Sequence, residues 1–329
     1  MTLSAWSRPA WRAIAAGVLA SVGLCCASPQ AWAQSYPNRP LRLIVPYAPG
    51  GNIDLTARLI APAMSKVLGQ NIVVDNRPGA TGAIGTEIAA KAPADGYTLV
   101  MAGANLTIVP FVYKQVGYDP VKDFTAIGGI MSVGLVLAAA PNFPANNLSE
   151  LRALAATRQV STASGGNGST AHVALEAIRS AGVPLVHVPF NGGAPALTAL
   201  MGGHVDTLVD TVNTSLPRIR DKSIKVIAQL GQTRSPLLPD VPTMTEQGIT
   251  GVRASTWTGL FTAAGLPQPV LQKLAAALEA ARQDPAVRKR FEEQAMSLFT
   301  STQPEFAAFV QDEIKSTGAV IKAARIAVE

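Results

Sequence analysis

Short runs rich in β-branched residues alternate with stretches of helical apolar spacing along most of this chain. Strand-like runs lie at 41–45, 71–74, 97–101, 134–139, 159–162, 185–189, 207–209, 225–228 and 257–262. Helix-like stretches lie at 55–68, 83–90, 149–158, 171–181, 194–201, 270–282 and 304–324. Such alternation predicts an α/β fold with mostly parallel sheets. Ligands of such sheets bind beyond the carboxyl ends of the strands, so we searched those ends for chemistry.

The N-terminus has the pattern of a targeting segment. Arg8 and Arg12 precede the apolar run 13–27, and Ala-Trp-Ala follows at 31–33. We interpret 1–33 as a secretory signal peptide that is cleaved after Ala33. The apolar run is shorter than the roughly 20 residues that span a membrane. The sequence therefore predicts an exported, soluble protein of the periplasm.

Cleavage would remove both cysteines, Cys25 and Cys26. A lipid-anchored cysteine is the alternative, but Val-Gly-Leu at 22–24 is a poor context for it. The mature chain would then have neither a disulfide nor a thiolate nucleophile. Its formal charge falls from +6 to +4, because two arginines leave with the signal. No run of Lys and Arg indicates nucleic-acid binding, whereas a modest positive charge suits anionic ligands.

A Gly-Gly turn ends the first strand, in the stretch "LIVPYAPGGNID" at 43–54. One interpretation is an anion site, where glycines let a ligand approach the amides of a helix start. The other is a tight turn with Asn52 as the helix N-cap. A related turn occurs at 192–201, where "GGAPALTALM" resembles "GGNIDLTARL" at 50–59. If the resemblance is meaningful, two glycine-rich helix starts face one cleft.

A third glycine-rich stretch, "GGNGSTAHVALEA" at 165–177, matches the dinucleotide fingerprint in its Ala variant. The fingerprint requires an acidic residue about 20 positions later, and 178–205 contains none. We therefore expect no nucleotide cofactor. The helix start, with the hydroxyls of Ser169 and Thr170, still suits an anion.

The three histidines, His172, His187 and His204, do not form a metal-binding pattern. His172 follows the glycine-rich loop, so it either lines a pocket or is a partly buried hydrogen-bonding residue. No G-x-S-x-G motif is present, although a Ser-His-Asp triad could still assemble from distant residues. Asp210 ends a short apolar run, where it is either a local cap or an acceptor in a pocket.

Several long motifs in one order resemble the Bug receptors, the periplasmic solute-binding proteins of tripartite tricarboxylate transporters. These motifs are "YPNRPLRLIVPYAPGGNID", "VVDNRPGATGAIGTEIAAKAPADGYTL", "HVPFNGGAPALTALMGGHVD", "LPDVPTMTEQG" and "WTGLFTAAGLPQPVLQKLAAAL". The resemblance covers 35–329. It implies a two-lobe type II periplasmic-binding-protein fold, each lobe a mostly parallel sheet flanked by helices. The implied lobes are 35–131 plus 257–329 and 132–256, joined by crossover strands at 134–141 and 255–265.

The resemblance also implies a small carboxylate ligand, held largely by backbone amides and waters, with no metal, cofactor or catalytic residue. The positions that match are Tyr47, Pro49, Gly50, Gly51, Asn52, Asp54, Asn105, Thr107, Ser164, Gly168, Ser169, Thr170, His172, Asn191, Gly192, Gly193, Ala194 and Asp210. The implied partners are the membrane permease subunits of the transporter, and we expect a monomer. Di- and tricarboxylates, acidic amino acids, nicotinate-like acids and aromatic acids all satisfy this scheme.

Two other functions stay open from the sequence. One is a sensor that presents its ligand to a signalling partner, and the other is an exported enzyme on the same fold. The only mature tryptophan, Trp257, lies in the second crossover. It is either a hinge residue whose surroundings change on closure or a core residue buried in every state.

Overall fold

The computed structural model describes residues 36–250, 252 and 254–323. The predicted signal peptide and both cysteines lie outside the described residues. Contacts divide the chain into 1–38 and 39–329, and all elements below belong to the second unit. No helix in the described part of the chain is long and apolar enough to cross a membrane.

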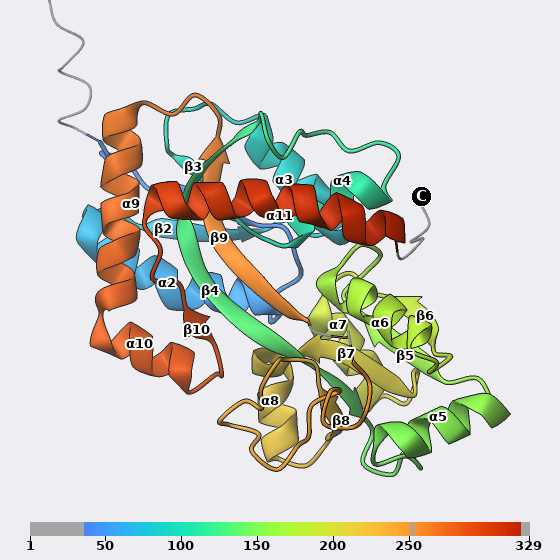
Figure 1. The fold of residues 1–329 in the computed structure, drawn as a ribbon. Coiled ribbons are helices and arrows are strands. Elements are labelled where there is room, and N and C mark those ends of the chain that lie inside the picture. The colour runs from blue at the N-terminus through green and yellow to red at the C-terminus, as the bar shows by residue number, and fades with distance from the viewer. Residues whose placement is uncertain (1–35, 251, 253, 324–329) are drawn as a thin grey trace, which may run out of the picture. The chain divides into compact units, whose positions relative to one another are not determined.

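The first sheet begins with three parallel strands in the order β2 (Ile72–Asn76), β1 (Leu41–Val45) and β3 (Thr98–Gly103). β9 (Ser255–Ala263) pairs antiparallel with β3, and the long strand β4 (Phe124–Ala139) pairs antiparallel with β9. A short strand, β10 (Ser297–Leu298), adds to β4. Figure 1 shows β4 in green beside β9 in orange.

The second sheet is built on the end of the same strand β4. Residues 124–134 of β4 pair with β9, whereas 135–139 pair with β7 (Thr207–Thr211) and β8 (Lys225–Gln229). Beyond β7 lie β5 (Ser161–Ser164) and β6 (Val186–Pro189), both in parallel pairing. The α/β class with crossover strands is confirmed. Each sheet is parallel in its outer strands and antiparallel where β4 and β9 join it.

Ten α-helices are present in the described part of the chain. They are α2 (Asn52–Leu68), α3 (Ala83–Ala90), α4 (Asn105–Val112), α5 (Leu148–Thr157), α6 (Thr170–Ser180), α7 (Gly193–Met201), α8 (Val212–Arg220), α9 (Gln268–Gln283), α10 (Pro285–Glu292) and α11 (Gln303–Ala323). A 3₁₀ turn, η3 (Ala80–Gly82), precedes α3. The sequence did not predict α4, α8 and α10. Pro110 lies within α4 and Pro217 within α8, and proline ordinarily argues against a helix interior.

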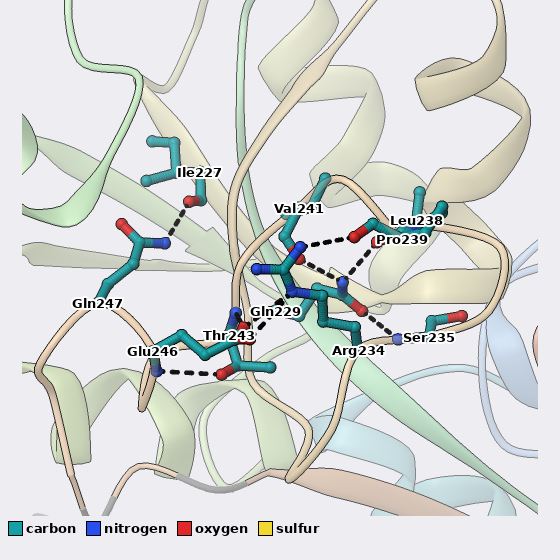
Figure 2. A network of polar contacts seen from close by, with 10 residues as sticks. All are labelled: Ile227, Gln229, Arg234, Ser235, Leu238, Pro239, Val241, Thr243, Glu246 and Gln247. Carbon is teal, nitrogen blue, oxygen red and sulfur yellow. Dashed lines mark hydrogen bonds and ion pairs between the residues drawn. The ribbon is translucent and has the colours of Figure 1, made fainter.

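The motif "LPDVPTMTEQG" at 238–248 lies in the loop that follows β8, where polar contacts hold the backbone (Figure 2). The buried Gln229 side chain donates to the carbonyls of Leu238 and Val241, at 2.8 and 2.7 Å. Thr243 and Glu246 form a reciprocal pair, in which each backbone N–H donates to the other side chain. None of these residues lines the cavity described below. The motif therefore shapes a loop of the second sheet.

Trp257 belongs to the core of the first sheet. It is 5% exposed, and its Nε1 donates to Glu313 Oε2 at 3.0 Å. Its ring packs edge-on against Phe306 and Phe309, with centroids 5.8 and 5.5 Å away. The structure therefore places Trp257 in the core, and a change of its surroundings on closure stays a prediction.

A pair of glycines makes room for Phe306 of α11. Gly129 on β4 pairs with Gly259 on β9, and the fully buried Phe306 ring lies against both. A Cβ on Gly129 or Gly259 would lie 2.7 or 2.3 Å from that ring. Because real atoms do not approach this closely, the two strands need glycine here for α11 to pack.

We predict that Gly259→Ala lowers the free energy of unfolding by about 1–3 kcal/mol, because the added methyl overpacks the Phe306 site. Urea unfolding followed by Trp257 emission measures this, since Trp257 contacts Phe306. Gly134→Ala is the control on β4, because a Cβ at Gly134 meets nothing within 4 Å. Equal effects of the two substitutions would contradict the packing argument.

Candidate functional site

Five of the described helices begin at one cavity of about 90 Å³. They are α2, α4, α6, α7 and α8, and they follow strands of both sheets. The lining residues are Tyr47, Gly51, Asn52, Ile53, Gly103, Asn105, Leu135, Gly165, Ser169, Thr170, Ala171, Gly192, Gly193, Asp210, Thr211 and Thr256. The first N–H groups of a helix have no partner within the helix, so five such starts concentrate amide donors here.

The β1–α2 turn is held by a buried carboxylate. Asp54 accepts hydrogen bonds from Gly50 N, Arg58 Nε and Asn76 Nδ2, each at 2.9 Å. Burial alone would raise the pKa of Asp54, but these hydrogen bonds together hold it below the usual value. Asp54 does not line the cavity. Asp54 instead fixes the loop that places Gly51 at the cavity.

Asn52 is the first residue of α2 and not its N-cap. Gly51 occupies the N-cap position, so no side-chain hydrogen bond caps this helix. Asn52 Oδ1 instead accepts from Asn213 Nδ2 of α8 at 2.8 Å. This contact ties the first turn of α2 to the first turn of α8, two helices that follow strands of different sheets.

Asn105 places a buried donor at the cavity. Its Oδ1 accepts from Gly103 N at 3.0 Å, which fixes the amide orientation. Its Nδ2 is buried and has no hydrogen-bond partner in the described part of the chain. The residue is 5% exposed and lines the cavity. An unsatisfied buried donor costs about 1–3 kcal/mol, so a ligand acceptor at this point would recover that cost.

Tyr47 lines the cavity and contacts Thr81, which lines a second hollow together with Tyr113 and Asn191. Its hydroxyl donates to Thr81 O at 2.9 Å. Cβ atoms on Gly82 and Gly192 would lie 3.2 and 3.7 Å from its ring, so the ring lies between glycines of the two predicted lobes. Burial raises the pKa of Tyr47 well above its usual value, so its phenol stays neutral.

The hydroxyls of Ser169 and Thr170 are engaged within the protein. Ser169 is the N-cap of α6, and its Oγ accepts from His172 N at 3.1 Å. Thr170 Oγ1 donates to Thr256 Oγ1 at 3.3 Å. The Thr170 hydroxyl proton is used in this contact, whereas the backbone amides of the α6 start and the hydroxyl proton of Ser169 can be donated to a bound anion.

Asp210 is the penultimate residue of β7 and is the acid among the cavity-lining residues. It is 6% exposed, and Ser215 Oγ donates to its Oδ2 at 3.1 Å. Burial raises the pKa of Asp210 to about 7, against the lowering effect of hydrogen bonds from Thr211 N and Ser215. A Cβ on Gly193 would lie 2.6 Å from Asp210 Oδ1, so α7 can begin here only with glycine.

The cavity brings together about half of the residues that the sequence singled out. These are Tyr47, Gly51, Asn52, Asn105, Ser169, Thr170, Gly192, Gly193 and Asp210. The remainder, Pro49, Gly50, Asp54, Thr107, Ser164, Gly168, His172, Asn191 and Ala194, are not among the lining residues. Thr107 Oγ1 donates to Ala104 O at 2.9 Å within the first turn of α4, and Asn191 lines the second hollow.

Sequence reasoning did not single out some lining residues: Ile53, Gly103, Leu135, Gly165, Ala171, Thr211 and Thr256. Gly103 and Thr211 end strands, which is a usable signal. Leu135 and Thr256 lie where the chain passes between the sheets, and nothing local marks them. In the described part of the chain, no group of three His, Cys, Asp or Glu could hold a metal ion.

Comparison with known proteins agrees with this architecture. BugT of Bordetella pertussis is 32% identical over 88% of this chain and 90% of its own length. A Rhodopseudomonas palustris protein solved with adipate is 30% identical, with a TM-score of 0.86 over 90% of this chain and 100% of its own. MatC from the same organism, solved with bound malate, is 32% identical, with a TM-score of 0.82 over 87% of this chain and 100% of its own.

Residues 56–326 match the model of the tripartite tricarboxylate transporter family receptor. This match covers more than half of the chain, and it agrees with the motifs, the two sheets and the crossover strands. The chain belongs to the tripartite tricarboxylate transporter receptor family, whose members are periplasmic solute-binding proteins.

Proposed function

We propose that this protein is a non-catalytic receptor that captures a small carboxylate in the cavity at the five helix starts. We further propose that it is exported by the signal at 1–33, acts as a monomer and delivers its ligand to transporter permease subunits. Family membership supports the receptor role. Two similar proteins were solved with adipate and malate, and both of these are carboxylates.

The buried Asn105 Nδ2 carries this proposal. It is a donor without a partner in the described part of the chain, placed where helix starts already concentrate amides. Each helix start favours an anion by about 0.3–1 kcal/mol through its dipole. None of the described lining residues is Lys, Arg or His. A carboxylate would therefore be bound by neutral donors.

The cavity size bears on how a ligand enters. At about 90 Å³, the cavity is smaller than an engineered one of roughly 150 Å³ that holds benzene. A ligand of malate size would therefore require it to widen. We propose that lobes of 35–131 plus 257–329 and 132–256 move apart to admit ligand. The exchange of β4 partners between Gly134 and Leu135 supports a boundary close to this position.

Asp210 would repel a bound carboxylate if it were ionised. Burial, which raises its pKa to about 7, keeps it largely protonated in mildly acidic solution. A protonated carboxyl can donate a hydrogen bond to a ligand oxygen, whereas an ionised one can only accept. We therefore propose that Asp210 binds carboxylates in its neutral form and accepts from a ligand hydroxyl or ammonium when ionised.

Titration calorimetry of protein purified from the periplasm tests the carboxylate proposal. We expect binding at one to one from a panel of malate, adipate, citrate, glutamate and nicotinate, unchanged by EDTA. Loss of binding with the chelator would contradict the metal-free scheme. Failure of every acid in the panel would contradict the assignment of a carboxylate ligand.

Asn105→Ala should weaken the binding of the same acid by about 1–3 kcal/mol, because it removes the buried donor. Asn191→Ala is the control, because Asn191 is exposed and lines the second hollow. Calorimetry measures the affinities of both variants and of the wild type for the acid. Equal affinities would remove Asn105 from the binding site.

Asp210→Asn should change how stability depends on pH. A carboxyl with a pKa of about 7 in the folded state and about 4 when unfolded binds more protons in the folded state between these values. Stability from this group therefore falls as pH rises from about 4 to 7, by at most about 4 kcal/mol. Urea unfolding from pH 4.5 to 8 should show this fall in the stability of the wild type relative to that of Asp210→Asn, because the other titrating groups are common to both proteins. Parallel pH profiles would contradict a protonated Asp210.

A further inference from the structure

Two histidines stack beneath the glycine-rich loop that precedes α6. The rings of His172 on α6 and His187 on β6 have centroids 4.1 Å apart and lie within 10° of parallel. Neither ring lines the cavity, but Gly165 and Ser169 of the loop above them do. The pair is therefore placed to act on the cavity through the loop.

His172 anchors the C-terminal end of the 165–169 loop, at Gly168. Its Nδ1 accepts from Gly168 N at 3.1 Å, which requires that this nitrogen carry no proton. Its Nε2 lies 3.7 Å from Glu176 Oε1, and Glu176 in turn pairs with Arg179 at 2.7 Å. The carboxylate favours a proton on Nε2, so the surroundings select the tautomer that leaves Nδ1 as an acceptor.

His187 anchors the N-terminal end of the same loop, at Gly166, through Ser164. Its Nε2 lies 2.6 Å from Ser164 Oγ, and that oxygen accepts from Gly166 N at 3.2 Å. Burial, followed by the nearby His172 and Arg179, lowers the pKa of His187 to about 4. The ring is therefore neutral near pH 7 and adds no charge beneath the loop.

The loop needs such anchors because its own backbone is permissive. Gly166 and Gly168 have φ values of +123° and +75°. Glycine adopts such positive φ values readily, but fixing a glycine in one conformation costs more entropy than fixing any other residue. Gly192 N donates to Gly165 O at 3.2 Å, so the loop also positions the start of α7. Movement of this loop would displace two of the helix starts at the cavity.

We propose that His172 and His187 are positioning residues, which as a stacked neutral pair hold the 165–169 loop in its binding geometry. An imidazolium has no acceptor, so a proton on His172 breaks the Gly168 contact and weakens ligand binding. Glu176 and Arg179 of α6 are charged side chains that act on the pair, Glu176 beside His172 Nε2 and Arg179 through its charge on His187. The effect on affinity rests on the proposed carboxylate function, whereas the anchoring of the loop does not.

Nuclear magnetic resonance on the wild type and three variants tests the anchoring. His172→Phe keeps a ring over His187 without the acceptor, and His172→Asn keeps an acceptor oxygen close to the Nδ1 position. His204→Phe is the control, because His204 is exposed after α7. At pH 7 the imidazole nitrogen spectra should show His172 Nδ1 unprotonated. Exchange of the Gly168 amide should become about tenfold faster in His172→Phe and stay within about threefold of wild type in the other two.

Calorimetry with malate and adipate supplies the second readout. Affinity should fall about tenfold in His172→Phe, matching the lost hydrogen bond, and recover in His172→Asn. Acidification should weaken wild-type binding more than that of His172→Asn.

A protonated Nδ1, or Gly168 exchange that is equal in His172→Phe and wild type, would overturn the anchoring role. Unchanged affinity in His172→Phe would overturn its effect on binding. Wild-type protein that binds neither acid would contradict the proposed function, while the exchange result decides the anchoring alone.

Discussion

The continuity of β4 through both sheets is the constraint on which the rest of the structure depends. Residues 124–134 pair with β9 and 135–139 pair with β7 and β8, without a break in the strand. The parallel strands on either side of it point their carboxyl ends toward a common region. Because helices follow these ends, five helix starts meet at one cavity. β9, packed along β4 through Gly129 and Gly259, supplies the return path (Figure 1).

The cavity obtains its polarity from the backbone, from uncharged polar side chains and from Asp210, whose pKa is raised to about 7 by burial. The buried carboxylate of Asp54 and the stacked histidines stay outside the cavity, yet each fixes a loop that lines it. Asn105, Asp210 and Thr211 are buried polar residues among those that line the cavity, and Asn105 and Asp210 are the ligand contacts that we propose. This arrangement separates loop positioning from ligand contact. Such a separation lets one scaffold accept different acids through changes at a few contact positions.

Much of the fold, and about half of the residues predicted for the site, agree with the structure and the lining of the candidate cavity. The Gly-Gly turns at 50–51 and 192–193 follow strands and open helices, so local pattern alone placed Gly51 and Gly193 at helix starts. The roles of Asp54 and His172 could not be predicted, because a side chain that lines a cavity and one that anchors the loop behind it occupy the same kind of sequence position. Leu135 and Thr256 reach the cavity only because β4 and β9 pass between the sheets. That placement is tertiary and leaves no local signal. Both α4 and α8 contain proline, and their packing overrides its usual effect.

The central claim is that neutral donors alone bind a carboxylate. A crystal structure of the protein with a bound carboxylate, either co-purified or added, tests this most directly. The account predicts a ligand carboxylate oxygen within hydrogen-bonding distance of Asn105 Nδ2 and of helix-start amides from both sheets. It also predicts that no Lys, Arg or His nitrogen lies within about 4 Å of that carboxylate, the range of an ion pair. A ligand whose carboxylate pairs with a cationic side chain, or one bound away from Asn105, would contradict it.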